Sequence, residues 1–211
     1  MPETVLLSTA YFAPVSYYVH LLHYKNIYIE QYENYSKQTY RNRCIILSAN
    51  GPLALSIPVL KTESLKNQTR DVEIDYNNRW KAMHWRAIES AYRSSPFFMY
   101  YADEIFECFQ LQENKLLNYN LQLQKCILNQ LGINLSYSLT SEYKKLEIPF
   151  IDGTDSFSPK QSKEKFPLQI RFVPYYQVFE NKYRFVPDLS ILDLLFNLGP
   201  ATEDYLKKCT K

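Results

Sequence analysis

Apolar residues recur at helical spacing between residues 78 and 98, the clearest pattern in the chain. One face collects Trp80, His84, Ala87, Ile88 and Ala91, with Met83 beside them. This spacing predicts a helix that turns the imidazole of His84 toward the core. Asn77 or Asn78 can cap its start, and Pro96 cannot continue it, so the helix should end near residue 95.

The first 30 residues combine two strand patterns with one helix pattern. Residues 4–10 are a short apolar run that fits a buried strand, and residues 27–30 indicate a second strand. Between them, residues 15–24 carry the apolar face of a helix. Strand, helix and strand in this order form a βαβ unit, so the sheet is predicted to begin with parallel strands.

A hairpin and a further strand are expected next. Residues 44–48 and 53–60 are apolar runs joined by Ala-Asn-Gly-Pro at residues 49–52, and Asn-Gly is a strong turn signal. The polar residues 61–70 indicate a mobile loop. Apolar and acidic positions alternate over residues 71–76, which is typical of a half-exposed strand.

The second half of the chain is mostly helical in pattern. Periodicity predicts helices over residues 97–110 and 113–131. Strands are expected over residues 133–139 and 168–174, and the charged, turn-rich residues 150–166 between them are expected to be flexible.

A continuous apolar run marks the C-terminal part. Asp188 is the expected cap of a helix over residues 189–196 that stops at Gly199, and Thr202 opens a short terminal helix. The run is too continuous for a free surface helix, so it should lie in the core or at a homodimer seam. The whole pattern predicts the α/β class in a single domain over residues 1–211: a mixed sheet with a βαβ start, a central helical layer and a packed C-terminal helix.

The composition argues against several classes of protein, among them nucleic-acid-binding proteins, proteins with a Gly-rich phosphate loop and membrane-spanning proteins. With 24 basic and 22 acidic residues the formal charge is +2, which gives no field that would favour nucleic acid. Four glycines leave no Gly-rich phosphate loop. The four cysteines are far apart in the sequence and form no Cys-x-x-Cys pair, so they are expected to be reduced thiols of a cytoplasmic protein: Cys44, Cys108, Cys126 and Cys209. No apolar run is long enough for a membrane span, and the first ten residues do not resemble a signal peptide.

Histidines and one carboxylate are the candidates for catalysis. His84 on an inward face can serve as a general acid or base, or it can be a core histidine bonded to a carbonyl. His20 and His23 are three residues apart on the first helix, but no third ligand is near, so no metal is expected. Glu30 ends the second strand, where α/β folds place functional groups.

The tyrosine-rich loop of residues 31–43 is the candidate for binding. It ends in Arg41, Asn42 and Arg43, and guanidinium groups can grip a phosphate or carboxylate through two hydrogen bonds. A solvated loop end is the alternative interpretation of the same pair of arginines. The chain has 19 tyrosines, which suit a carbohydrate or amide ligand or, alternatively, a core with wet edges.

Several motifs together resemble the WbqC-like family. Residues 9–14, Thr-Ala-Tyr-Phe-Ala-Pro, are similar to its Q-P-Y-F-x-P opening. Further similar segments follow: Tyr-Val-His at 18–20, Arg-Asn-Arg-Cys-Ile at 41–45, Leu-Ser-Ile-Pro-Val at 55–59, the tryptophan-rich helix and Pro-Phe-Phe at 80–98, Tyr-Tyr-Gln at 175–177 and Leu-Ser-Ile-Leu-Asp-Leu-Leu-Phe-Asn at 189–197. The chain departs from the pattern at Thr9, Ala10, Tyr17 and the Glu30-Gln31 pair.

The resemblance implies a role in surface-polysaccharide (O-antigen) biosynthesis. One reading is an enzyme that transfers a glycyl, aminoacyl or other acyl group to a sugar or sugar nucleotide, without a cofactor. The alternative is a non-catalytic glycan- or metabolite-binding protein of the same pathway. The residues expected to act in catalysis are His84, His20 and Glu30. Those expected to bind substrate are Tyr11, Arg41, Asn42, Arg43 and Tyr92.

Overall fold

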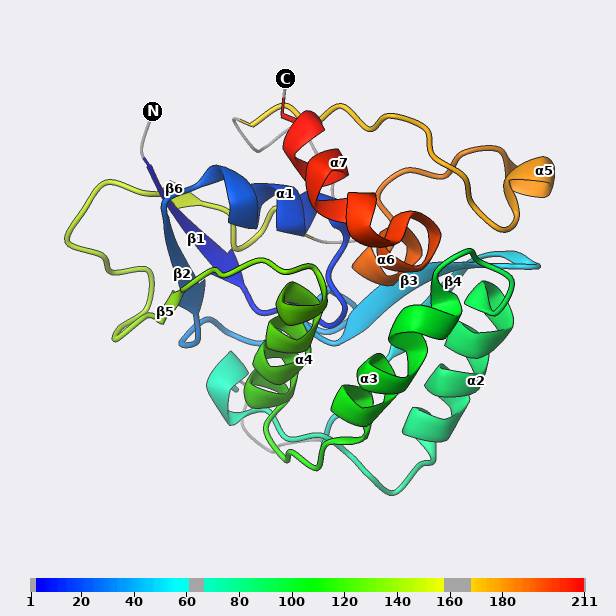
Figure 1. Ribbon diagram of the computed structural model, residues 1–211. Coiled ribbons are helices and arrows are strands. Elements are labelled where there is room, and N and C mark those ends of the chain that lie inside the picture. Colours follow the sequence, from blue (N-terminus) through cyan, green and yellow to red (C-terminus); the bar gives the residue numbers. More distant parts are fainter. Residues whose placement is uncertain (1–2, 61–66, 158–167, 211) are drawn as a thin grey trace.

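The computed structural model describes residues 3–60, 67–157 and 168–210 (Figure 1). In chain order its elements are β1 (Thr4–Ser8), α1 (Val15–His23), β2 (Asn26–Glu30), β3 (Arg43–Ser48), β4 (Gly51–Ser56), the 3-10 turn η1 (Thr69–Asp71), α2 (Trp80–Tyr92), α3 (Phe98–Gln110), α4 (Leu116–Gln130), β5 (Ser138–Leu139), β6 (Ile151–Asp152), α5 (Glu180–Tyr183), α6 (Ile191–Leu198), η3 (Gly199–Ala201) and α7 (Thr202–Lys208). The chain is therefore of the predicted α/β class. The expected mobile loops at 61–70 and 150–166 fall largely outside the described residues.

The main sheet is parallel. Within the described residues its four strands run in the order β5-β2-β1-β6, and all three pairings are parallel. Leu6 of β1 lies opposite Tyr28 of β2, and α1 forms the crossover between the two strands. Val5, Leu6 and Leu7 are fully buried, as expected of a strand with protein on both faces. The predicted βαβ start is confirmed.

Two strand predictions in the second half are wrong. Residues 168–174 form no strand, whereas β6 lies in the segment that was expected to be a flexible loop. β6 is only two residues long, and its backbone is held by β1 rather than by a local apolar pattern. The expected strand over 133–139 shrinks to the two residues of β5.

The predicted hairpin forms with an earlier second strand. β3 and β4 pair antiparallel around a turn at Ala49 and Asn50, and Gly51 adopts φ 101° at the start of β4. Only Gly takes such a conformation readily. In Figure 1 the hairpin lies between α6 on one side and α2 and α3 on the other. Residues 71–76 make isolated bridges, among them Val59 with Ile74, instead of the expected strand.

Helices α2, α3 and α4 make the expected helical layer. Trp80 of α2 is buried edge-on against the rings of Phe109 in α3 and Tyr119 in α4. His84 follows one turn later on the same buried face. Met83, which the pattern placed beside that face, is 59% exposed. The helix begins after Arg79 without a side-chain cap, so the predicted asparagine cap is wrong.

Helix α6, the predicted apolar helix near the C-terminus, lies in the core, as its apolar run predicts. Every residue from Ile191 to Asn197 is buried. The capping residue is Ser190, whose hydroxyl accepts a hydrogen bond from the Leu192 N–H at 3.3 Å. The expected cap, Asp188, instead accepts a bond from the Ser16 N–H of α1 at 2.7 Å. No helix in the described part of the chain is long and apolar enough to cross a membrane.

Candidate functional site at the carboxyl edge of the sheet

A buried ion pair lies where the parallel strands end. The Arg41 guanidinium donates through Nε to Glu33 Oε1 and through Nη2 to Glu33 Oε2, each at 2.6 Å. Nη2 also donates to Ser8 Oγ at 2.9 Å and to the Thr154 carbonyl at 3.3 Å. The Ser8 hydroxyl lies 3.0 Å from Glu33 Oε2 and 2.9 Å from the Thr154 carbonyl. Ser8, Glu33, Arg41 and Thr154 are called the edge network below.

The edge network occupies the switch point of the sheet. From β1 the chain crosses to β2 on one side, whereas β6 pairs with the other side of β1. Ser8 is the last residue of β1, and Thr154 lies two residues beyond β6. In open α/β sheets, ligands bind outside the carboxyl ends of the strands at this kind of crevice. The polar groups of the network therefore stand at the place where this fold class forms its sites.

Burial decides the electrostatics of the pair. The side chains of Arg41 and Glu33 are only 6% and 5% exposed. Burial raises the pKa of the Glu33 carboxyl, and the hydrogen bonds and charge of Arg41 oppose that rise. Burial would lower the pKa of Arg41, but Glu33 outweighs it and raises the pKa. Two short bonds to a protonated guanidinium indicate an ionised Glu33. The interpretation of Arg41 as a solvated loop end is therefore wrong.

A second, partly exposed charge cluster borders the edge network. Asp152 of β6 accepts from Lys144 Nζ at 2.6 Å and from the Thr154 hydroxyl at 2.6 Å. These bonds lower the pKa of the Asp152 carboxyl, although its partial burial acts to raise it. Thr154 thus touches both clusters, through its carbonyl and through its hydroxyl. The carboxyl edge of the sheet therefore carries paired charges of both signs.

Glu30 is buried at the end of β2 and holds the next segment in place. Its Oε1 accepts from the Tyr32 N–H at 2.7 Å and from the Thr140 hydroxyl at 3.0 Å. Its Oε2 accepts from the Lys144 N–H at 2.6 Å. The carboxylate therefore ties β2 to the segment after β5. Its expected catalytic role stays a prediction.

Tyr11 and His84 are in direct contact. The Tyr11 hydroxyl lies 3.0 Å from His84 Nδ1, and the backbone of Ser56 bonds to the imidazole as well. Burial lowers the pKa of His84 to about 4, so the ring is neutral at pH 7. If the imidazole N–H is donated to the carbonyl of Ser56, Nδ1 must accept from the Tyr11 hydroxyl. The structure thus brings together two residues that the sequence named as separate candidates.

The two residues after Arg41, Asn42 and Arg43, bond to the end of β4 and the residue after it. Arg43 donates from Nε to the Ser56 hydroxyl at 2.9 Å, so Arg43 and His84 both reach Ser56. Asn42 donates from Nδ2 to the carbonyl of Ile57 at 2.9 Å. This hydrogen bond from the Asn42 side-chain amide joins the end of the tyrosine-rich loop to the hairpin. Substrate contacts for both residues stay predictions.

His20 has a different set of neighbours. Its Nδ1 lies 2.6 Å from the Ser16 carbonyl, one turn earlier on α1. The ring stacks on Tyr24 and meets Phe157 edge-on. Burial lowers its pKa to about 4, which keeps this imidazole neutral at pH 7 as well. The expected catalytic role of His20 stays a prediction.

Tyr92 belongs to a buried network around Asp193 of α6. Asp193 Oδ1 accepts from the Tyr175 hydroxyl at 2.6 Å and from Gln177 Nε2 at 2.9 Å. Burial raises the pKa of Asp193 to about 6, against the hydrogen bonds from Tyr175 and Gln177. This network ties the segment before α5 to the core. The expected substrate-binding role of Tyr92 stays a prediction.

Sequence reasoning did not find Ser8, Glu33 or Thr154. Glu33 lies in the tyrosine-rich loop eight residues before Arg41, and the presence of opposite charges in one loop is the only sequence signal for this ion pair. Ser8 and Thr154 are 146 residues apart, so their contact follows from the β1–β6 pairing. Among residues 3–60, 67–157 and 168–210 no group of three or more His, Cys, Asp or Glu side chains could hold a metal ion.

Comparison with known proteins identifies the family. The sequence matches the model of the WbqC-like protein family over residues 10–149, which is more than half of the chain. The chain belongs to the WbqC-like family. Of the edge network, Glu33 and Arg41 lie inside the matched range, as do Tyr11 and His84. The C-terminal motif at 189–197 lies outside it.

A distant bacterial relative of this WbqC-like chain carries no functional description. It is "Uncharacterized protein Rv1507c" of Mycobacterium tuberculosis (strain ATCC 25618 / H37Rv), 26% identical over 196 residues. The alignment covers 83% of this chain and 84% of the relative. No solved structure matches the chain.

Proposed function

We propose that this WbqC-like protein acts in surface-polysaccharide (O-antigen) biosynthesis in the cytoplasm. In this proposal it transfers a glycyl, aminoacyl or other acyl group to a sugar or sugar nucleotide. The observation that carries the proposal is the edge network, a buried ion pair with two hydroxyl-bearing residues at the switch point of a parallel sheet. Crevices of this kind are where α/β folds bind small substrates.

The proposed transfer makes three chemical demands. A hydroxyl or amino group of the sugar attacks the acyl carbonyl carbon, and the bond from that carbon to the donor's leaving group breaks. The proton of the attacking group passes through a base to the leaving group, and the oxyanion that forms needs positive charge or N–H donors. Arg41 supports this reading because its guanidinium, paired with Glu33, holds polar groups in place at the carboxyl edge of the sheet. His84 supports it because burial keeps its pKa low and its imidazole neutral.

The test is a product assay across a donor panel. The protein is incubated with sugar nucleotides and activated glycine or short acyl thioesters, and products are read by mass spectrometry. A mass increase equal to the acyl group is expected, and it should fall in Ser8→Ala, which removes one hydroxyl from the edge network. Loss of turnover with an unchanged unfolding curve would tie the chemistry to this crevice.

A specific observation favours a second candidate, a non-catalytic binding protein of the same pathway. Glu30, His20 and His84 are only 0%, 3% and 6% exposed, and each bonds to protein groups. Side chains so enclosed can stabilise a binding surface without meeting substrate. A ligand that stabilises the folded protein but is never turned over, across the full donor panel, would favour this candidate.

A further inference from the structure

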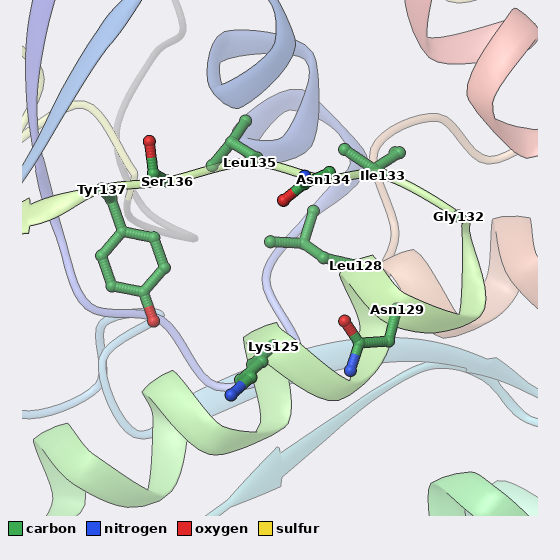
Figure 2. A pocket seen from close by; sticks show the side chains of 9 residues that line it. All are labelled: Lys125, Leu128, Asn129, Gly132, Ile133, Asn134, Leu135, Ser136 and Tyr137. Atoms are coloured by element: carbon green, nitrogen blue, oxygen red, sulfur yellow. The ribbon is translucent and has the colours of Figure 1, made fainter.

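A hollow of about 410 Å³ lies beside the C-terminal half of α4, and none of the residues of the edge network lines it. One wall is the helix surface at Lys125, Leu128 and Asn129, and the other is the extended segment 132–137 that leads into β5. Figure 2 shows Tyr137 pointing from the extended segment toward α4, with Lys125 and Asn129 on the facing helix. The volume is within the range of small-molecule pockets.

The polar lining of the hollow is not used by the protein itself. Within the described residues no carboxylate lies within ion-pair distance of Lys125. In the same part of the chain, no side-chain hydrogen bond involves Asn129 or Ser136. All three side chains are exposed. One cation, one amide and one hydroxyl therefore remain available to a ligand.

Tyr137 adds an aromatic surface between these groups. Its ring is half-buried and packs against the core. Burial raises the pKa of Tyr137, so its hydroxyl stays protonated and can donate a hydrogen bond. Leu128 and Leu135 line the hollow on either side. A ligand with an apolar face and a polar edge matches this arrangement.

The end of α4 does not oppose a negative ligand. The last carbonyls of a helix carry partial negative charge. Here the carbonyls of Ile127, Leu128 and Asn129 accept bonds from the N–H groups of residues 131, 133 and 132 at 2.9–3.0 Å. Side chains on a helix lean toward its N-terminus, which carries the Lys125 amine away from this end. The positive charge of Lys125 is therefore the dominant one in the hollow.

We propose that this hollow binds an acidic sugar, a hydroxylated ring that carries a carboxylate or a phosphate. The acid group bonds to Lys125, the ring lies on Tyr137, and Asn129 and Ser136 bond to its hydroxyls. The site shares no residue with the edge network, so the proposal does not rest on the proposed transfer reaction. Glucuronate and glucose 1-phosphate are probes of the two kinds of acid.

The test is a titration of the 15N-labelled full chain followed by amide NMR. Each acidic sugar should shift the amides of residues 125–137, and the titration gives a Kd. Glucose and inorganic phosphate should bind at least about fivefold more weakly, because each lacks half of the contacts. The acidic sugar with the lower Kd identifies the carboxylate or the phosphate as the natural acid group.

Variants make the proposal refutable. Lys125→Gln should raise the Kd about fivefold, the effect of a partly exposed ion pair. Lys208→Gln is the matched control, since it removes a charge of the same sign from an exposed position on α7 and should leave the Kd unchanged. Absence of shifts at residues 125–137 would overturn the proposal. So would equal binding of glucose, or an equal Kd for Lys125→Gln and the wild type.

Discussion

Removing Arg41 should destabilise the fold strongly and in a pH-dependent way. In Arg41→Met, Glu33 loses two bonds of 2.6 Å and keeps only the hydroxyl of Ser8. Its carboxyl is 5% exposed, so water cannot replace the guanidinium. Breaking a buried pair from one side costs about 3–5 kcal/mol of unfolding free energy.

The pH dependence follows from the charge that is left behind. Without Arg41, burial raises the pKa of Glu33 further, and the carboxyl can escape the penalty by binding a proton. The loss of stability in Arg41→Met should therefore be smaller at pH 5 than at pH 8. The double variant Arg41→Met/Glu33→Leu should cost less than the sum of the single variants, because it leaves no unpaired buried charge.

The assay is urea denaturation followed by tryptophan fluorescence, since the chain has two tryptophans. An exposed ion pair provides the control: Lys25 bonds to Glu3 at 2.6 Å with side chains 72% and 60% exposed. Lys25→Gln should cost no more than about 1 kcal/mol. The reasoning is refuted if Arg41→Met costs less than about 1 kcal/mol at pH 8, or if the single losses add exactly in the double variant.

Of four further predictions, two concern pH, one the core and one a glycine. Burial lowers the pKa of His84 from 6.5 to about 4, so the unfolded chain binds this proton first as pH falls. About 3 kcal/mol of unfolding free energy should therefore be lost between pH 6.5 and pH 4 in urea titrations, and His84→Gln should remove this slope. The contribution of Asp193 to stability has the opposite pH dependence, because its pKa is raised from 3.8 to about 6 and stability therefore falls as pH rises from about 4 to 6. In Asp193→Asn this contribution is absent, so the unfolding free energy should fall more steeply as pH is lowered from about 7 to 4 in urea titrations. An unchanged slope would contradict this. Leu195→Ala should cost about 2–5 kcal/mol in chemical denaturation, since Leu195 is fully buried, and a loss below about 0.5 kcal/mol would place α6 outside the core. Gly199→Ala should lower the Tm, because the new Cβ would lie 2.5 Å from the Phe97 ring at φ 52°, and an unchanged Tm would argue against that packing.

The local sequence pattern by itself determined the elements whose buried residues lie close together along the chain. The helical spacing around Trp80 and His84 predicted α2 and its inward imidazole, and the apolar run before Gly199 predicted α6. The βαβ start followed because strand and helix periods differ and the crossover has one favoured hand. The motifs along the chain together predicted the family, and the family match over residues 10–149 confirms it.

Tertiary structure decided the pairings between distant segments. β6 has two residues in a charged segment, and its conformation comes from hydrogen bonds to β1 that no local period encodes. That pairing brings Thr154 to Ser8, and the two close around Arg41 and Glu33. Whether an arginine at a loop end is solvated or buried depends on what covers it, and here Ser8 and Thr154, 146 residues apart, help to cover it. The edge network is thus a product of strand order, which sequence spacing does not contain.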